Sequence, residues 1–508
     1  MEHFFDPEKS PLTKAASWSH GELLERYALI EAELLRVVDE NYKLRDLKTR
    51  GEQIKLLLAE QMESLRDAEY GASSERYKRP KESEKPPTAP KPRVKKPSER
   101  YPNLPIREQE IAQDPAPQCA CCGEMMTDSG MREESEQLNV IPKKYEILRQ
   151  SRVKYRCQCH GSIITAASPP RIIPGSSYSD EMIVDVALSK YCDLIPIERY
   201  MAMAGRGGLK DLPPQSLIEL THGFADFVSP VYSLIKNGVL SSRVLHADET
   251  PHQMLEGSDK KSWYLWGFST LEHCFLECHA TRSGDVASEV LIKSKGEILV
   301  TDVYSGYAKA VRIANEQRGL EGRPLIRNAY CNAHARRYFY KNWPKYPEAQ
   351  FYLDHYHEIY QLEAAAKGQA PPETLQLRMQ MAPRFEAMKK KAMAELAAYP
   401  EQGKYYKALK YFLGNYAGLT LFLGDAGVPI DNNSQERILR NHVVGRKTWY
   451  GTHSQRGALT AAILFTVVET CKLNGVNPRE YFKALVQELL AGSPPRTPSQ
   501  YRCALPAT

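Results

Sequence analysis

The apolar positions near the N-terminus repeat with the seven-residue spacing of a coiled coil. The positions of this seam are Leu23, Tyr27, Ile30, Leu34, Val37, Asn41 and Leu44. A polar Asn inside a seam lowers stability but fixes register and strand number, so the pattern favours a specific parallel dimer. The alternative is a single helix that packs on its own domain.

Apolar periodicity predicts helices and then strands in the middle of the chain. Residues 173–240 have a helical pattern, which indicates either core helices or a helix-turn-helix whose recognition helix begins near Gln215. The runs that follow are short, alternating or continuously apolar, and they predict strands. These strands are 243–254, 262–268, 273–279 and 297–301, with a helix near 286–293. This order is typical of a mixed α/β core.

The C-terminal third returns to a helical pattern. Residues 347–423 are rich in Ala, Leu, Lys and Glu, which indicates a helical insertion. After it we expect a short segment at 434–440, a basic turn at 445–451, a helix near 458–473 and a last helix that ends at Leu490.

Length and composition narrow the class of protein. A chain of 508 residues predicts several domains, and 42% hydrophobic residues suffice for buried cores. The formal net charge of +6 favours a polyanionic partner only weakly. We find neither an apolar run of eighteen residues nor a signal-peptide pattern, so we expect a cytoplasmic protein without a membrane partner. Its 11 cysteines then favour thiols and metal ligands over disulfides.

Between Lys78 and Pro97 the sequence is dominated by Lys, Arg, Glu and Pro. Such a segment buries too little apolar area to offset its ordering entropy, so it predicts a linker. Its basic excess suits contacts with phosphates, and a solvated spacer with no role in DNA binding is the alternative.

Two cysteine clusters follow the linker. Cys119 and Cys122 have the spacing of a turn that presents two thiolates to one tetrahedral ion. Cys157 begins a second pair, whose other member is either His160 or Cys159. The predicted ligands of a structural Zn²⁺ are therefore Cys119, Cys122, Cys157 and His160, with Cys159 as the alternative. A cysteine-rich turn without metal is the competing interpretation.

Two aspartates stand where predicted strands place ligands. Residues 243–250 alternate, so Asp248 and Glu249 point to opposite faces of their strand. Asp302 ends an apolar run that suits a buried strand, and ligands of α/β sheets bind at the carboxyl ends of such strands. Two carboxylates on adjacent strands repel each other unless a cation lies between them. We therefore expect a divalent-metal site at this edge.

A third acid, Glu436, opens a helical segment. If Asn433 is the N-cap, Glu436 occupies the third helical position and closes a capping box. It also lies one turn before Arg440 and can pair with it. The local sequence therefore explains Glu436 without any catalytic role.

The chain carries a series of short motifs in a fixed order. They are Ser73-Ser-Glu-Arg, the Cys119 to Gly123 turn, Lys154-Tyr-Arg-Cys, Lys190-Tyr-Cys-Asp-Leu-Ile-Pro, His246-Ala-Asp-Glu-Thr-Pro, Asp302-Val-Tyr-Ser-Gly-Tyr, Ala333-His-Ala-Arg-Arg, Asp431-Asn-Asn-Ser-Gln-Glu-Arg, Gly445-Arg-Lys and Leu473-Asn-Gly-Val-Asn-Pro. In this order they resemble the large transposase of the IS66 insertion-sequence family over nearly the whole chain. The departures are the irregular second metal pair and Asn332, where the family more often has a bulky residue.

The resemblance implies an RNase H-like core with a D-D-E triad of Asp248, Asp302 and Glu436, interrupted by a helical insertion before the glutamate. Such a triad holds Mg²⁺ or Mn²⁺ through oxygen ligands, with Asp248 as the bridging ligand of two ions. The implied reaction is cleavage of terminal inverted-repeat DNA and strand transfer into target DNA. The resemblance also implies a homodimer or higher oligomer, small accessory proteins of the same element and association with the nucleoid.

Together these predictions give a multidomain α/β protein. Its expected segments are a coiled-coil helix at 17–70, a basic linker at 71–104, a zinc-binding domain at 105–172, a helical domain and candidate for DNA binding at 173–240, the first part of the core at 241–342, the helical insertion at 343–424 and the second part of the core at 425–508.

Basic and aromatic residues near the triad predict contacts with DNA. They are His334, Arg336 and Arg337 on a predicted helix, and Arg446, Lys447 and Trp449 behind Glu436. A solvated basic face is the alternative for these positions. For the whole protein, the alternatives are a zinc-containing dimeric DNA-binding regulator without catalysis and a stand-alone RNase H-like nuclease.

Overall fold

A computed structural model describes residues 96–111, 117–127, 132, 134–141, 143–156, 163–255 and 262–504, and scattered positions between 19 and 40. Most of the predicted coiled coil and linker lie outside these described residues. Of the predicted seam, Leu34 and Val37 are described, and both are helical and exposed. The chain divides into two compact units, of which the smaller contains the described residues of 96–149 and 203–210.

The smaller unit is held by polar contacts more than by a core. Its short helix α2 (Pro97–Arg100) buries no residue. The backbone N–H and the hydroxyl of Ser98 both donate to the Glu136 carboxylate at 2.8 Å. Arg132 forms an exposed ion pair with Glu110 at 2.8 Å. Exposed pairs of this kind contribute little stability.

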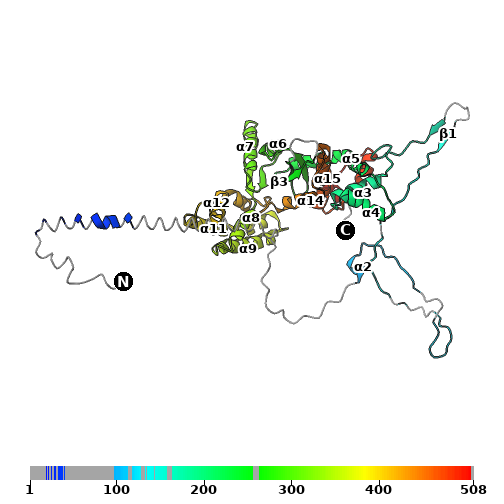
Figure 1. Cartoon of the computed structure of the whole chain (residues 1–508), viewed down its shortest axis with the longest axis horizontal. Helices are drawn as coiled ribbons and strands as arrows, with labels where there is room; N and C mark the ends of the chain where they lie inside the picture. The colour runs from blue at the N-terminus through cyan, green and yellow to red at the C-terminus, as the bar shows by residue number, and fades with distance from the viewer. Residues whose placement is uncertain are drawn as a thin grey trace. The chain divides into compact units, whose positions relative to one another are not determined.

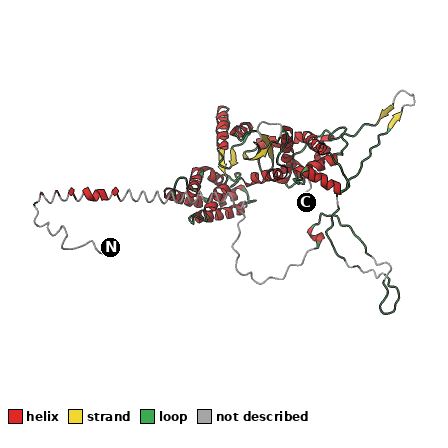
Figure 2. Cartoon of the chain, viewed as in Figure 1, coloured by secondary structure: helices red, strands yellow, loops and turns green. Residues whose placement is uncertain are grey.

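The larger unit is built on a five-stranded mixed sheet, drawn in yellow in Figure 2. Its order is β5-β4-β3-β6-β7; β3, β4 and β5 pair antiparallel, and β6 and β7 continue parallel to β3. The strands are β3 (Val244–Gln253), β4 (Ser262–Ser269), β5 (Cys274–His279), β6 (Ile298–Thr301) and β7 (Arg327–Tyr330). Four of these are the predicted strands, whereas β7 was not predicted. A separate antiparallel pair joins β1 (Lys154–Arg156) to β2 (Ile163–Thr165).

Helices α6 (Gly284–Lys293) and α7 (Ser305–Leu320) cover one face of the sheet (Figure 1). They share a buried core with Leu245 and Ala247 of β3 and Leu299 of β6. The opposite face meets α14 (Asn433–Trp449) against β3 and β4. Helix α15 (Gln455–Leu473) borders the outer edge of β5, where the Thr466 hydroxyl accepts the N–H of Leu276 at 2.9 Å. Because neighbouring residues of a strand point to opposite faces, each strand contributes to both layers.

The predicted helical insertion forms its own core. Its elements are α9 (Ala349–Ala366), α10 (Pro371–Met379), α11 (Ala382–Glu395), η3 (Leu396–Ala398), α12 (Lys404–Gly414), α13 (Tyr416–Thr420) and η4 (Leu421–Gly424). They pack with α8 (Asn332–Asn342) and with Ile298 and Val300, the residues of β6 that alternate with Leu299. The insertion therefore packs on the same face of the sheet as α14, at the end formed by β6 and β7.

Two buried side chains fix the C-terminal end of the insertion. The Arg378 guanidinium, 3% exposed, donates to the carbonyl oxygens of Phe422, Asp425 and Val428 at 2.8–2.9 Å. The fully buried Asn332 amide donates to the carbonyl of Leu419 at 2.9 Å and to that of Ile430 at 3.1 Å. This explains the polar residue at position 332, since a bulky apolar side chain makes neither bond.

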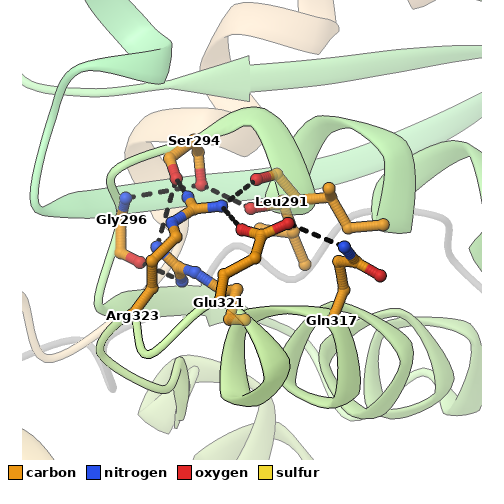
Figure 3. Close-up of polar contacts among 8 residues, drawn as sticks. Leu291, Ser294, Gly296, Gln317, Glu321 and Arg323 are labelled. Atoms are coloured by element: carbon orange, nitrogen blue, oxygen red, sulfur yellow. Dashed lines mark hydrogen bonds and ion pairs between the residues drawn. The ribbon is translucent and has the colours of Figure 1, made fainter.

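The turn that leads into β6 is held by two arginines. Figure 3 shows Arg323 and its neighbours between the end of α6 and the end of α7. Arg318, 1% exposed, donates to the carbonyls of Gly296 at 2.6 Å and Ser294 at 3.1 Å. Arg323 donates to Ser294 as well and to the carbonyl of Ile292 at 2.8 Å. These bonds set where β6 begins, and with it the position of Asp302 four residues after Ile298.

The predicted helical region holds α3 (Asp180–Tyr191), α4 (Ile197–Arg206) and α5 (Pro214–Leu240). The buried face of α5 packs on α15 and α3, which favours core helices over a recognition helix beginning near Gln215. The chain ends with α16 (Pro478–Leu490) and α17 (Pro498–Ala504). Among the described helices, none alone has the length and hydrophobicity of a membrane span; the bent pair α15 and α16 meets the length and composition criteria only in combination.

The predicted basic turn at 445–451 is wrong, because α14 continues as one helix to Trp449. Gly445 does not break it: a Cβ added there would lie 2.5 Å from Cζ2 of Trp449. The glycine thus makes room for the Trp449 ring. The helix ends at Tyr450, which has a positive φ of 67°.

Replacing Asn332 by Ala should lower the free energy of unfolding by about 1–3 kcal/mol, because it leaves the buried Leu419 carbonyl without its donor. Denaturant unfolding of the full chain measures this difference. Asn237, exposed on α5, provides the control: its replacement by Ala should change stability by less than about 0.5 kcal/mol. Equal stability of the two variants would contradict the assigned role of Asn332.

Candidate functional site

Asp248 and Asp302 face each other across two adjacent parallel strands. The register pairs Val244 with Ile298 and His246 with Val300. When this register is continued past the end of β6, Asp248 falls opposite Asp302. Asp248 alternates with His246, and Asp302 with Val300, so both carboxylates lie on the face covered by α14 and the insertion.

The start of α14 is fastened directly to β3. Asn432, the residue before the helix, is 1% exposed. Its side chain donates to the Ala247 carbonyl at 2.9 Å and bonds with Nδ1 of His246 at 2.8 Å. The first turn of α14 therefore lies beside Asp248, and this turn contains Glu436.

Gly267 permits this close approach. It is the β4 residue paired with Asp248 in the antiparallel register. A Cβ at this position would lie 2.3 Å from Nε2 of Gln435, the residue before Glu436. A larger residue here would displace the Gln435 side chain and would also crowd Leu276 and Leu439, at 3.0 and 3.1 Å from the added atom. The glycine therefore favours close packing at the site itself.

The pKa of Asp248 shows that other acidic groups lie near it. Burial is the main reason that this pKa rises to about 8, and the negative charges of Glu249, Asp302 and Glu436 also raise it. Without a cation, Asp248 therefore holds a proton at neutral pH. The site favours any ligand that adds positive charge between these acids.

The three predicted acids make few hydrogen bonds. Asp248 accepts one backbone N–H, from Glu249 at 2.9 Å, and Asp302 accepts one, from Tyr304 at 3.1 Å. Oε1 of Glu436 is buried and accepts none from the described residues. Most of the lone pairs of these carboxylates are therefore available to a metal ion.

The neighbouring acids Glu249 and Asp431 are already engaged. Glu249 points to the other face, where it accepts hydrogen bonds from Arg282 at 2.8 Å and from the Tyr307 hydroxyl at 2.5 Å. Asp431 accepts from the Asn433 amide at 2.7 Å and the Tyr360 hydroxyl at 3.2 Å. Their partners distinguish both residues from the three sparsely bonded acids.

The capping-box interpretation of Glu436 does not hold. The N-cap is Asn432 rather than Asn433, so Glu436 lies one position too late for such a box. Its recorded ion pair is with Nδ1 of His334 at 3.6 Å, and none with Arg440 occurs among the described contacts. Neither local role explains this glutamate.

The residues predicted to contact DNA lie on two helices. His334, Arg336 and Arg337 are on α8, where His334 approaches Glu436. On α14, Arg446 donates to the carbonyl of Pro251, and Trp449 packs under Lys190 at 5.8 Å from its ring centroid.

The face of α14 that carries Glu436 is basic farther along the helix. Arg440 and Lys447 follow Glu436 at helical spacing, and both are exposed. Sequence reasoning does not group Arg440 with Lys447, because the basic turn predicted at 445–451 ends the helix early. In the continuous helix, Glu436, Arg440 and Lys447 have the i, i+4, i+11 spacing that places them on one face.

The first cysteine pair has a structure suited to metal binding. The Cys119 N–H donates to the Glu124 carbonyl at 2.8 Å, and the Gly123 N–H donates to the Cys119 carbonyl at 2.9 Å. The backbone N–H groups of Cys121 and Cys122 lower the pKa of the Cys119 thiol to about 7. The predicted ligands Cys157 and His160, and the alternative Cys159, lie outside the described residues.

Comparison with known proteins identifies the family. The model described as Transposase IS66 family matches residues 175–460, more than half of the 508-residue chain. The chain belongs to the IS66 transposase family. A second family model, the zinc-finger binding domain of transposase IS66, matches residues 117–160 of this IS66 transposase, which supports a structural zinc there.

Similar sequences also occur in Sinorhizobium fredii. The uncharacterized protein y4hP of that organism is 25% identical over 400 residues, which cover 74% of this chain and 71% of y4hP. The uncharacterized protein y4jD is 25% identical over 393 residues, 74% of this chain and 75% of y4jD. These relatives extend the similarity over most of both chains.

Replacing Asp248 by Asn should raise the melting temperature of the protein at pH 8 in the absence of added magnesium. The folded-state pKa of Asp248, about 8, is above the unfolded value of about 4. The contribution of Asp248 to the free energy of unfolding is therefore fully present below pH 4 and is lost as the pH rises to 8. The difference between variant and wild type should therefore grow across this range in thermal unfolding.

Asp285→Asn is the matched control. The Lys309 ammonium holds the pKa of this exposed aspartate below its usual value. Its replacement removes a weak attraction instead of a repulsion, so the melting temperature should stay the same or fall. A lower melting temperature for Asp248→Asn at pH 8 would contradict the convergence of charges at the site.

Proposed function

We propose that this IS66 transposase cuts and joins DNA at a divalent-metal site formed by Asp248, Asp302 and Glu436. The observation that carries the proposal is the placement of three sparsely bonded carboxylates on the same side of the sheet, on β3, at the end of β6 and in the first turn of α14. Acids placed this way repel one another unless cations neutralise them, which is the arrangement of metal-dependent phosphoryl transfer sites.

The order of the sheet supports an RNase H-like core. Three antiparallel strands lead into two strands parallel to the first, with the first strand at the centre. The proposed acids lie on that first strand, at the end of the fourth, and on the helix that follows the insertion. The insertion rests on β6, β7 and α8, so Glu436 can return to β3 after it.

The proposed ligands fit Mg²⁺ or Mn²⁺, because all of them are carboxylate oxygens and the pKa of Asp248 is raised by its acidic neighbours. Such ions supply activation of the attacking hydroxyl and stabilisation of the leaving 3′-oxygen. Asp248 would hold such an ion together with Asp302 on the neighbouring strand and with Glu436 on the first turn of α14, which docks beside it. Asn432 holds the first turn of α14 so that Glu436 faces the strand ends.

DNA binding is proposed for the basic side chains around this centre. Arg440 and Lys447 extend along α14 from Glu436, and α8 adds Arg336 and Arg337 beside His334. These side chains suit the phosphates on either side of a scissile bond. The zinc-finger domain at 117–160 is the second element of the chain expected to contact DNA.

Asp248→Asn, Asp302→Asn and Glu436→Gln should each retain binding to terminal inverted-repeat DNA and lose Mg²⁺-dependent cleavage. The expected loss is about 10³-fold or more, because metal ligation supplies several kcal/mol of transition-state stabilisation. Glu249→Gln is the control, since this acid is bound to Arg282 and Tyr307; it should cleave within about tenfold of wild type.

Gel analysis of labelled ends measures both steps. Joined products indicate strand transfer, whereas nicks alone indicate a nuclease. Undiminished cleavage by Asp248→Asn would refute the proposed triad.

Lys447→Glu combined with Arg440→Glu should weaken binding of the transposon end, most strongly at low salt, because both substitutions place negative charge near phosphates. Fluorescence anisotropy at several salt concentrations measures the effect and its salt slope. Lys483→Glu, an equal charge reversal per residue at an exposed position of α16, should leave binding nearly unchanged. Equal binding by all variants would remove α14 from the interface.

A further inference from the structure

Three metal-binding side chains meet where α8 and α14 begin. Cys331 immediately precedes α8, His334 is in its first turn, and Glu436 is in the first turn of α14. One ligand atom from each lies within 4.8 Å of the other two. The cluster shares Glu436 with the proposed triad, but Cys331 and His334 belong to neither the triad nor the zinc-finger region.

Two atoms of this cluster lack partners. Nδ1 of His334 and Oε1 of Glu436 are buried without a hydrogen bond from the described residues. They are 3.6 Å apart, which is too long for a hydrogen bond between them. Buried polar atoms are nearly always satisfied, so an atom that bridges the gap is expected here.

The third side chain of the cluster is that of Cys331. The Cys331 thiol is fully buried and accepts the N–H of Asn432 at 3.3 Å, the residue that fastens α14 to β3. The same contact places the sulfur beside the start of α14. The three side chains are therefore held by the docking of the two helices and not by flexible loops.

The chemistry of this set differs from that of the triad. A thiolate, an imidazole and a carboxylate are ligands that Zn²⁺ and similar soft ions prefer, whereas Mg²⁺ prefers oxygen ligands alone. Three protein ligands also match open zinc sites, in which water takes the fourth position.

We propose that Cys331, His334 and Glu436 form a second metal site, which takes Zn²⁺ and thereby withdraws Glu436 from the triad. Binding releases the thiol proton of Cys331 to solvent, since thiolate is the ligand form. The inhibitory consequence rests on the proposed function, whereas the binding of zinc does not. Zinc would thus act as an inhibitor that competes with Mg²⁺ for one carboxylate.

Zinc content tests the site without any activity measurement. The full chain is equilibrated with Zn²⁺, freed of loosely bound ions by gel filtration and analysed for zinc per chain. Cys331→Ser should hold one zinc fewer than wild type, and Cys119→Ser should lose the zinc-finger ion instead. Cys274→Ser, at another fully buried thiol, should equal wild type.

Equal zinc content in Cys331→Ser and wild type would overturn the proposed site. If Cys331→Ser fails to fold, as judged by thermal unfolding, His334→Gln takes its place and must show the same loss of one zinc. A Cys331→Ser variant that loses zinc together with Cys274→Ser also counts against the site, because the loss then follows from core disruption.

Cleavage assays test the competition. Zn²⁺ should inhibit Mg²⁺-dependent cleavage by wild type, and added Mg²⁺ should relieve the inhibition. Cys331→Ser should need more than about tenfold more zinc for the same inhibition, since it lacks one ligand. Equal inhibition of both would overturn the regulatory part. If neither protein cleaves DNA with Mg²⁺, the proposed function fails, and the zinc content still decides the site.

Discussion

The hydrogen bonds of Asn432 are the contact on which the candidate site depends. This one buried side chain joins the start of α14 to the His246 ring and to the Ala247 carbonyl, and its backbone N–H reaches Cys331. It therefore ties together β3, α8 and α14, which carry Asp248, His334 and Glu436. Gly267 leaves room for the helix to come close. Farther along α14, His442 contacts His252 and Arg446 donates to the Pro251 carbonyl, which also hold the helix on β3.

The same packing brings carboxylates close enough to repel one another. The fold brings acidic side chains together on the sheet while giving each only one hydrogen bond or none. Around them, Arg378, Arg318 and Asn332 donate hydrogen bonds to buried carbonyls of the scaffold. Buried polar atoms of His334, Gln435 and Glu436 lack partners at the proposed site, and other such atoms occur elsewhere among the described residues. Unsatisfied groups of this kind are common at functional sites.

The sequence predicts the strands that have a clear pattern. Alternation places Asp248 and Glu249 on opposite faces of β3. The hydrogen bond from Tyr307 of α7 to Glu249 agrees with this. It does not predict β7, because Arg327-Asn-Ala-Tyr contains a single fully buried residue, Ala329. It misjudges Gly445 as a helix breaker, because the Trp449 ring that needs the space is recognised only in three dimensions.

Sequence reasoning also could not assign Glu436 or find the Cys331 cluster. The capping interpretation depended on which of two adjacent asparagines begins the helix, and the local sequence permits both. Cys331 and Glu436 are separated by the whole insertion, so no local spacing reveals that their side chains meet. Long-range contacts of this kind depend on how the helices dock, and resemblance to a family substitutes for that information only at positions that match its motifs.

The unbroken length of α14 sets the span of the DNA contact that is proposed for this helix. From Glu436 to Lys447 the helix rises about 16 Å, at about 1.5 Å per residue. One strand of duplex DNA advances about 3.4 Å per base, so this distance corresponds to about five base steps. Under the proposed function, α14 would therefore set the distance between the bond at the metal site and a phosphate about half a turn of DNA away. A change in the length of this helix would then shift the point of cutting along the DNA.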